Sequence, residues 1–163
     1  MSVVSSAASS STSAGSSSSS AAAPASTQVT PTAPAPDPNL DLGQQIVDYA
    51  LSFVGTKYVY AGASPSGFDC SGLVSYVYRQ FGVSLTRSSA GQYRDNGSHI
   101  QRSELAPGDL IFTSSNGRTV THVAIYMGDN KIVHSARSSG GVVIGNLNHD
   151  YYTRTWFGAK RVI

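Results

Sequence analysis

The sequence predicts an α+β fold, in which helices packed on a small antiparallel sheet form one domain. Helical patterns come first, because apolar residues recur at helical spacing over residues 43–54 and again over residues 70–81. From residue 110 onward, short runs rich in Val and Ile are separated by turns that contain Gly, Asp and Asn. Helices followed by hairpin-linked strands favour an α+β arrangement over a repeating βαβ fold.

Three helices are predicted before the main strands begin. The first covers residues 43–54. The second starts at Cys70, shortly after a turn-forming run of Ala, Ser, Pro and Gly at residues 63–67. It extends to residue 81, and Gly82 is typical of a helix end. A third, shorter helix is predicted over residues 88–94, with a hydroxyl side chain as its N-cap.

The remaining elements are predicted as short strands. Gly128-Asp129-Asn130 is typical of a tight hairpin turn, so the strands on its two sides are expected to pair antiparallel. Pro107-Gly108-Asp109 is expected to form the turn that leads into another strand. The predicted extended segments are residues 58–60, 110–112, 120–127, 131–134, 142–144 and 156–163.

The composition divides the chain near residue 38. Of residues 1–38, 31 are Ser, Ala, Pro or Thr and none is aromatic, so we expect this segment to be a disordered linker. Residues 39–163 hold every aromatic residue and carry a net charge of +3, and they are long enough for one domain. That charge is scattered and lacks the basic stripe that nucleic-acid binding requires, so no nucleic-acid partner is expected.

The sequence contains no run of membrane-spanning length, and its N-terminus lacks the basic and apolar regions of a signal peptide. A linker that begins directly after Met1 resembles the interior of a longer secreted protein. We therefore expect a monomeric domain that is tethered to a missing N-terminal region and acts outside the cell. The alternative is that the natural protein begins here and is cytoplasmic, or is exported by another route.

Cys70 is the only cysteine of the chain, so no intrachain disulfide can form. It stands at the predicted start of a helix, where unpaired N–H groups and the helix dipole stabilise a thiolate. A lone cysteine is more often a small buried hydrophobe. The polar neighbours Asp69 and Ser71, together with histidines further along the chain, favour a nucleophile instead.

Two histidines complete a pattern that is typical of covalent catalysis. His122 opens one predicted strand and His134 closes the next, so the hairpin is expected to bring them to the same end of the ladder. Cys70 would be the nucleophile, His122 the base and His134 the group that orients His122. Each histidine alone could be structural. A zinc site is disfavoured because short-spaced ligand pairs and a fourth ligand are missing, and no metal or cofactor is expected.

The chain resembles the NlpC/P60 family of papain-like cysteine peptidases over about residues 43–163. Six segments carry the resemblance, in the order and at the spacing usual in that family. They are residues 58–62, 64–74, 85–92, 105–112, 122–126 and 132–135. The resemblance implies a papain-like fold and hydrolysis of bacterial cell-wall (peptidoglycan) stem peptides, commonly between γ-D-glutamate and a diamino acid.

By that resemblance, Cys70, His122 and His134 take the positions of a Cys-His-His triad. The substrate-binding residues that the resemblance implies are Tyr58, Asp69, Ser71, Arg87, Ser88 and Ser89. Of these, Arg87 is expected to bind a substrate carboxylate and Asp69 a substrate amine.

Three residues differ from those usual in the family: Tyr60 stands where Trp is usual, Ala61 where Gly is usual and Thr86 where Pro is common. These differences concern specificity more than activity. Two alternatives to the peptidase stay open. One is a wall amidase that cuts between the sugar lactyl group and the peptide, and the other is a wall-binding module without activity.

Overall fold

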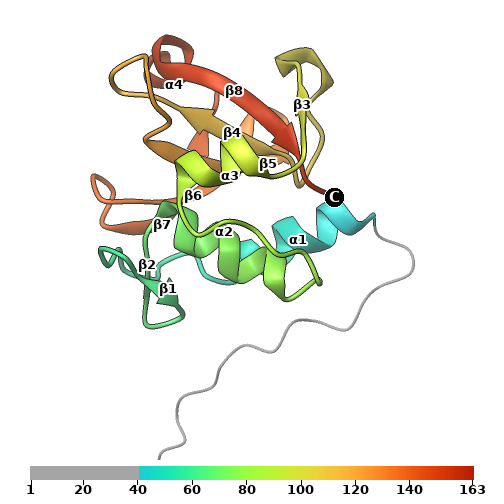
Figure 1. Cartoon of the computed structure of the whole chain (residues 1–163). Helices are drawn as coiled ribbons and strands as arrows, with labels where there is room; N and C mark the ends of the chain where they lie inside the picture. The colour runs from blue at the N-terminus through green and yellow to red at the C-terminus, as the bar shows by residue number, and fades with distance from the viewer. Residues whose placement is uncertain (1–40) are drawn as a thin grey trace, which may run out of the picture. The chain divides into compact units, whose positions relative to one another are not determined.

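A six-stranded antiparallel sheet with two helices against one of its faces forms the centre of the structure (Figure 1). The structure, a computed structural model, describes residues 41–163, so the linker predicted at residues 1–38 lies outside the described residues. The helices are α1 (Leu42–Leu51), α2 (Cys70–Arg79), α3 (Ser89–Asp95) and α4 (Asp150–Thr155), with a 3₁₀ turn at Arg102–Glu104. The strands are β1 (Ala63–Ser64), β2 (Gly67–Phe68), β3 (Ser98–Ile100), β4 (Leu110–Thr113), β5 (His122–Gly128), β6 (Lys131–Ala136), β7 (Gly141–Asn146) and β8 (Trp156–Arg161). The predicted α+β fold is confirmed.

The large sheet has the strand order β3-β8-β4-β5-β6-β7, and β1 and β2 form a separate small hairpin before α2. The predicted hairpin joins β5 to β6, and Gly128 pairs with Lys131 across it. Asp129 and Asn130 both have positive φ, 52° and 58°, as a two-residue type I′ turn requires. This turn sets the register of the two strands that carry the histidines.

The two faces of the sheet bury different sets of side chains. On β5, Val123 and Ile125 join the core that contains α1 and α2, whereas Ala124 and Tyr126 join a second cluster with Tyr152 of α4. Successive strand residues point to opposite faces, so His122 belongs to the second face. Each face therefore has its own helical cover, and the candidate catalytic residues come from both.

Several elements differ from the sequence predictions. α1 ends at Leu51 and α2 at Arg79, a few residues before the predicted ends. The residues that follow each helix form hydrogen bonds to the carbonyl three residues earlier, in tighter turns than those of an α-helix. The segment predicted as a strand at residues 58–60 makes only isolated bridges, at Lys57 and Tyr58. The β1–β2 hairpin, β3 and α4 were not predicted, since two to six residues are too short for a periodic signal.

None of the helices within residues 41–163 combines the length and the apolar character that crossing a bilayer requires.

Candidate active site

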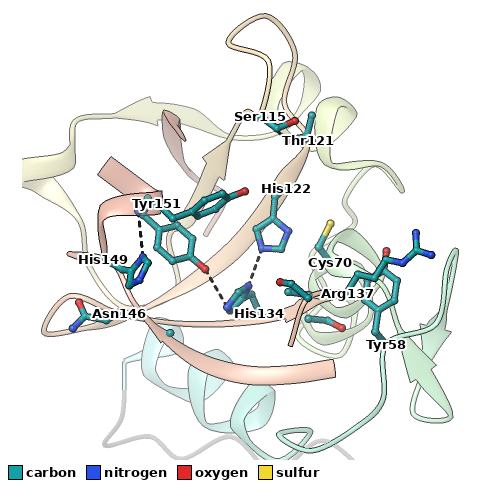
Figure 2. A pocket seen from close by; sticks show the side chains of 15 residues that line it. Tyr58, Cys70, Ser115, Thr121, His122, His134, Arg137, Asn146, His149 and Tyr151 are labelled. Atoms are coloured by element: carbon teal, nitrogen blue, oxygen red, sulfur yellow. Dashed lines mark hydrogen bonds between the residues drawn. The ribbon is translucent and has the colours of Figure 1, made fainter. Parts of the chain in front are cut away.

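A cavity of about 710 Å³ opens beside Cys70, at the end of the sheet where β5 begins (Figure 2). Its walls come from the segment before α2, from the loop before β5, from β6 and β7, and from the turn and helix that follow β7. The lining residues are Tyr58, Cys70, Ser115, Thr121, His122, His134, Ser135, Ala136, Arg137, Ser138, Gly145, Asn146, His149, Tyr151 and Tyr152.

The start of α2 fixes the position of Cys70. Asp69 is the N-cap of the helix, and its carboxylate accepts a hydrogen bond from the Gly72 N–H at 2.6 Å. A Cβ at position 72 would overlap the carbonyl oxygen of Gly62. Glycine at this position therefore lets the start of α2 pack closely against the turn before β1. Ser135 of β6 donates to the Phe68 carbonyl at 2.7 Å and ties the segment before Cys70 to the strand that carries His134.

The two predicted histidines are in direct contact. Nε2 of His122 lies 2.8 Å from Nδ1 of His134. On the other side of the second ring, Nε2 of His134 lies 3.2 Å from the hydroxyl oxygen of Tyr152. Figure 2 shows the His122 ring between the Cys70 sulfur and the His134 ring. Because Nε2 of His122 faces His134, the ring has Nδ1 left for the thiol.

Burial favours the uncharged forms of all three groups. It raises the pKa of the Cys70 thiol above its ordinary value, although the backbone N–H of Val123 opposes this by donating to the sulfur. Burial, with a smaller contribution from His134, lowers the pKa of His122 to about 3, and burial lowers the pKa of His134 to about 4. The sequence-based expectation of a lowered thiol pKa is therefore wrong for this structure, because loss of solvation outweighs the N–H groups at the helix start.

Tyr58 lies beside the predicted nucleophile. Its pKa is raised by burial first, then by the neighbouring Cys70 and Asp69, while the positive charge of Arg137 acts in the opposite direction. The phenol group of Tyr58 therefore stands near both the sulfur and the Arg137 guanidinium, and both residues line the cavity with it.

The other predicted substrate-binding residues lie outside the cavity lining. Arg87 forms an ion pair with Asp69 at 2.9 Å and donates to Ser71 Oγ at 2.9 Å and to the Gly62 carbonyl at 3.3 Å. Its guanidinium is thus already committed within the chain, which argues against its expected role as the ligand of a substrate carboxylate. The Asp69 carboxylate is likewise shared between Arg87 and the helix cap.

Ser88 and Ser89 have local positions at the start of α3. The Ser88 hydroxyl is the N-cap and accepts from the Gly91 N–H at 3.0 Å, as the sequence-based expectation of a hydroxyl cap required. Ser89 is the first residue of the helix. Neither side chain lines the cavity.

Sequence reasoning missed Tyr152, Arg137 and the α4 helix. His149, which the sequence gives as an ordinary loop residue, caps α4 by accepting from the Tyr151 N–H at 3.2 Å and lines the cavity. The segment Asp150–Thr155 forms a helix too short for periodicity to reveal. Within residues 41–163, no group of three His, Cys, Asp or Glu side chains is placed to hold a metal ion.

Comparison with known proteins gives a family and several relatives. The model of the NlpC/P60 family matches residues 55–161. The chain is 38% identical over 126 residues to an Escherichia coli K12 protein named murein DD-endopeptidase MepS/murein LD-carboxypeptidase, covering 77% of this chain and 65% of that protein. It is also 38% identical over 120 residues to a Bacillus cereus γ-D-glutamyl-L-lysine dipeptidyl-peptidase, covering 72% of this chain and 36% of that protein.

The solved structures agree with this assignment. The crystal structure of an NlpC/P60 family protein from Bacillus cereus superposes with a TM-score of 0.71 at 36% identity, covering 80% of this chain and 41% of that chain. The chain thus spans two thirds or less of the length of these relatives. The match of a family model to most of the chain, together with the shared fold, shows that this chain belongs to the NlpC/P60 family.

Proposed function

We propose that this domain is a cysteine endopeptidase that hydrolyses peptidoglycan stem peptides at the γ-D-glutamyl–diamino acid bond. The observation that carries the proposal is the 2.8 Å contact between His122 and His134 in the cavity that also exposes Cys70. The relatives named as murein endopeptidases and as a γ-D-glutamyl-L-lysine peptidase support the substrate class. Such a substrate lies in the cell wall, so the proposal includes action outside the cytoplasmic membrane.

The order of the hydrogen bonds determines which histidine can be the base. For Nδ1 of His122 to take the thiol proton, Nε2 of His122 must carry a hydrogen and donate it to Nδ1 of His134. Neutral His134 then carries its hydrogen on Nε2, and the Tyr152 oxygen is there to accept it. Tyr152 is in this scheme a positioning residue, because its hydroxyl selects the one arrangement in which His122 is a base toward Cys70.

The reaction follows from that arrangement. His122 takes the thiol proton as the sulfur attacks the carbonyl carbon of the scissile amide, and the carbonyl oxygen gains negative charge. The backbone N–H groups at the start of α2 and the Tyr58 hydroxyl are the donors that we propose for this oxyanion. The imidazolium of His122 then protonates the leaving amine as the C–N bond breaks, leaving a thioester on Cys70. Water, deprotonated by His122, hydrolyses that thioester and restores the thiol.

The cluster of Asp69, Ser71 and Arg87 has a different part in this proposal. It holds the start of α2 and the turn before β1 together, so that it positions the Cys70 backbone. Ser88 and Ser89 stand at the start of α3, and we propose no direct contact of theirs with the substrate. The proposal does not require Arg87 to release Asp69.

The amidase and the wall-binding module remain the competing functions. Digestion of purified sacculi followed by product analysis separates the peptidase from the amidase. New amino termini on the diamino acid support the γ-glutamyl peptidase, new amino termini created by cleavage after D-alanine indicate a DD-endopeptidase, and sugar chains freed of whole peptides indicate an amidase. The Cys70→Ala variant tests the wall-binding module. Wild-type lysis by that variant would contradict the catalytic proposal and favour the binding module.

A further inference from the structure

Gln92 of α3 is a fully buried amide side chain that lies against the start of α2. Its Nε2 donates to the Ser71 carbonyl at 3.2 Å and to Ser75 Oγ at 3.1 Å. The two helices that carry these residues are neighbours in the fold (Figure 1). Because Ser71 directly follows Cys70, the amide reaches the backbone beside the proposed nucleophile from 21 residues further along the chain.

The position of Gln92 is set by its own helix. Its N–H donates to the Ser88 carbonyl at 2.8 Å, and its carbonyl accepts from the Asn96 N–H at 3.2 Å. The preceding residue, Gly91, packs so closely on Thr86 that a Cβ there would lie 2.3 Å from the Thr86 methyl group. The amide therefore projects from a backbone that is bonded on both sides, which makes it a fixed donor.

The peptide unit between Ser71 and Gly72 is held at both ends. Its carbonyl oxygen accepts the hydrogen bond from Gln92, and its N–H donates to the Asp69 carboxylate at 2.6 Å. A peptide unit is planar, so fixing both of its ends limits the rotation of the unit that precedes it. That preceding unit joins Cys70 to Ser71, and the hydrogen bond from Gln92 therefore restrains the backbone at the nucleophile.

The N–H groups of Cys70 and Ser71 belong to the first turn of α2, where N–H groups have no partner within the helix. Burial raises the pKa of the Cys70 thiol, and these two N–H groups act in the opposite direction by donating to the sulfur. We propose that Gln92 is a positioning residue, which holds this turn so that its N–H groups point at the oxyanion formed during attack. This inference rests on the proposed function.

The amide oxygen of Gln92 separates this role from a purely structural one. Within residues 41–163, Oε1 is buried and accepts no hydrogen bond. Burying an acceptor without a partner costs free energy, and an apolar side chain of similar length would avoid that cost. In such a variant the Ser75 hydroxyl can instead donate to the Ser71 carbonyl, four residues earlier in the helix. The amide is therefore expected to add little to stability.

Gln92→Met tests the inference, because methionine is similar in size to glutamine and has no N–H to donate. The variant should lower kcat on a γ-D-glutamyl-L-lysine peptide about 5- to 20-fold with KM nearly unchanged, since the oxyanion exists only during attack. It should unfold at the same urea concentration as wild type or at a higher one, whereas removal of a structural residue would lower that concentration. Gln92→Leu repeats the comparison with a second apolar side chain.

Ser75→Ala is the matched control, because it removes the second partner of Gln92 and leaves the hydrogen bond to the Ser71 carbonyl. Its kcat should stay within about twofold of wild type.

A γ-D-glutamyl peptide aldehyde gives a second measurement. The Cys70 sulfur bonds to the aldehyde carbon, and the thiol proton passes to the aldehyde oxygen, which then lies where the oxyanion would form. The inhibition constant of the aldehyde should rise in Gln92→Met by about the factor by which kcat falls. That of the corresponding alcohol, which cannot bond to the sulfur, should not change.

A kcat in both apolar variants equal to that of Ser75→Ala would overturn the inference and leave the peptidase standing. An equal rise in the inhibition constants of the aldehyde and the alcohol would do the same, because it would show a change in ordinary substrate binding. Loss of the folded state in both apolar variants would also overturn it, since Gln92 would then be needed for stability. If wild type cleaves no γ-D-glutamyl peptide, the proposed function itself is contradicted, and this inference with it.

Discussion

The hydroxyl oxygen of Tyr152 lies 3.2 Å from Nε2 of His134, on the side of the ring that faces away from His122. Tyr152 comes from α4 and His134 from β6, and the two side chains pack on the same face of the sheet. Burial raises the pKa of Tyr152 to about 12, so its hydroxyl keeps its proton near neutral pH. A neutral hydroxyl that can accept a hydrogen bond therefore stands behind the second histidine.

Removal of that hydroxyl should slow the chemical step. Tyr152→Phe leaves the ring in place and is expected to lower kcat about 3- to 10-fold with KM nearly unchanged, because one hydrogen bond that orients His134 is lost. The measurement is steady-state hydrolysis of a γ-D-glutamyl-L-lysine peptide. Tyr151→Phe is the control, since Tyr151 lines the same cavity and, in the part of the chain that the structure describes, its hydroxyl forms no hydrogen bond with a histidine. Equal losses in the two variants would show that Tyr152 has no special role.

The buried histidines should make the fold sensitive to acid. Both have pKa values lowered by burial, to about 3 for His122 and about 4 for His134, whereas in the unfolded chain they titrate near 6.5. Below that value the unfolded chain binds protons that the folded chain does not, so the free energy of unfolding falls as the pH falls from 6.5 toward 4. Urea unfolding at several pH values measures this slope.

His134→Gln isolates one part of that slope. The variant should lose less stability than wild type over the same pH range, because one of the two groups that resist protonation is gone. His99→Gln serves as the control, since His99 is exposed on β3. A slope in His134→Gln as steep as in wild type would mean that His134 does not contribute to it.

The thiol of Cys70 should react slowly at neutral pH in the folded protein. Burial raises its pKa above the ordinary value of 9.0, so the thiolate fraction near neutrality is smaller than that of a free cysteine. Alkylation by iodoacetamide is therefore expected to be slower in the folded protein than in the urea-unfolded chain and to accelerate as the pH rises past 9.0. A rate that reaches its plateau below neutral pH would show instead that proton transfer to His122 outweighs the effect of burial.

Ala61 has a backbone conformation that costs stability. Its φ is 61°, in the left-handed region, where a Cβ meets the following carbonyl. Ala61→Gly should raise the free energy of unfolding by about 0.5–1 kcal/mol. This is the strain relieved in the folded protein minus the cost of the greater flexibility of glycine in the unfolded chain. Ala63→Gly is the control and should lower stability, because the φ of Ala63 in β1 is not positive. A decrease in both variants would show that the turn is unstrained.

Local patterns were sufficient for much of the fold. The apolar spacing in α1 and α2, the Asp129-Asn130 turn and the strands on either side of it are all properties of neighbouring residues, and the structure contains each of them. The start of α2 at Cys70 was predicted for the same reason, since a polar cap after a Gly-rich turn is a local signal. The hairpin alone already implied that His122 and His134 approach each other.

The tertiary structure alone determined the contacts between residues far apart in the chain. It also determined the elements that are too short to show a periodic sequence pattern. Tyr152 reaches His134 because α4 folds back over the sheet. Arg137 and Tyr58 line the same cavity because the β6–β7 turn is hydrogen-bonded to the segment before β1. The raised pKa of the Cys70 thiol, opposite to the sequence-based expectation, has the same origin. A helix start is visible in the sequence, but the solvent that a side chain loses depends on every element packed around it, and that sum exists only in the folded chain.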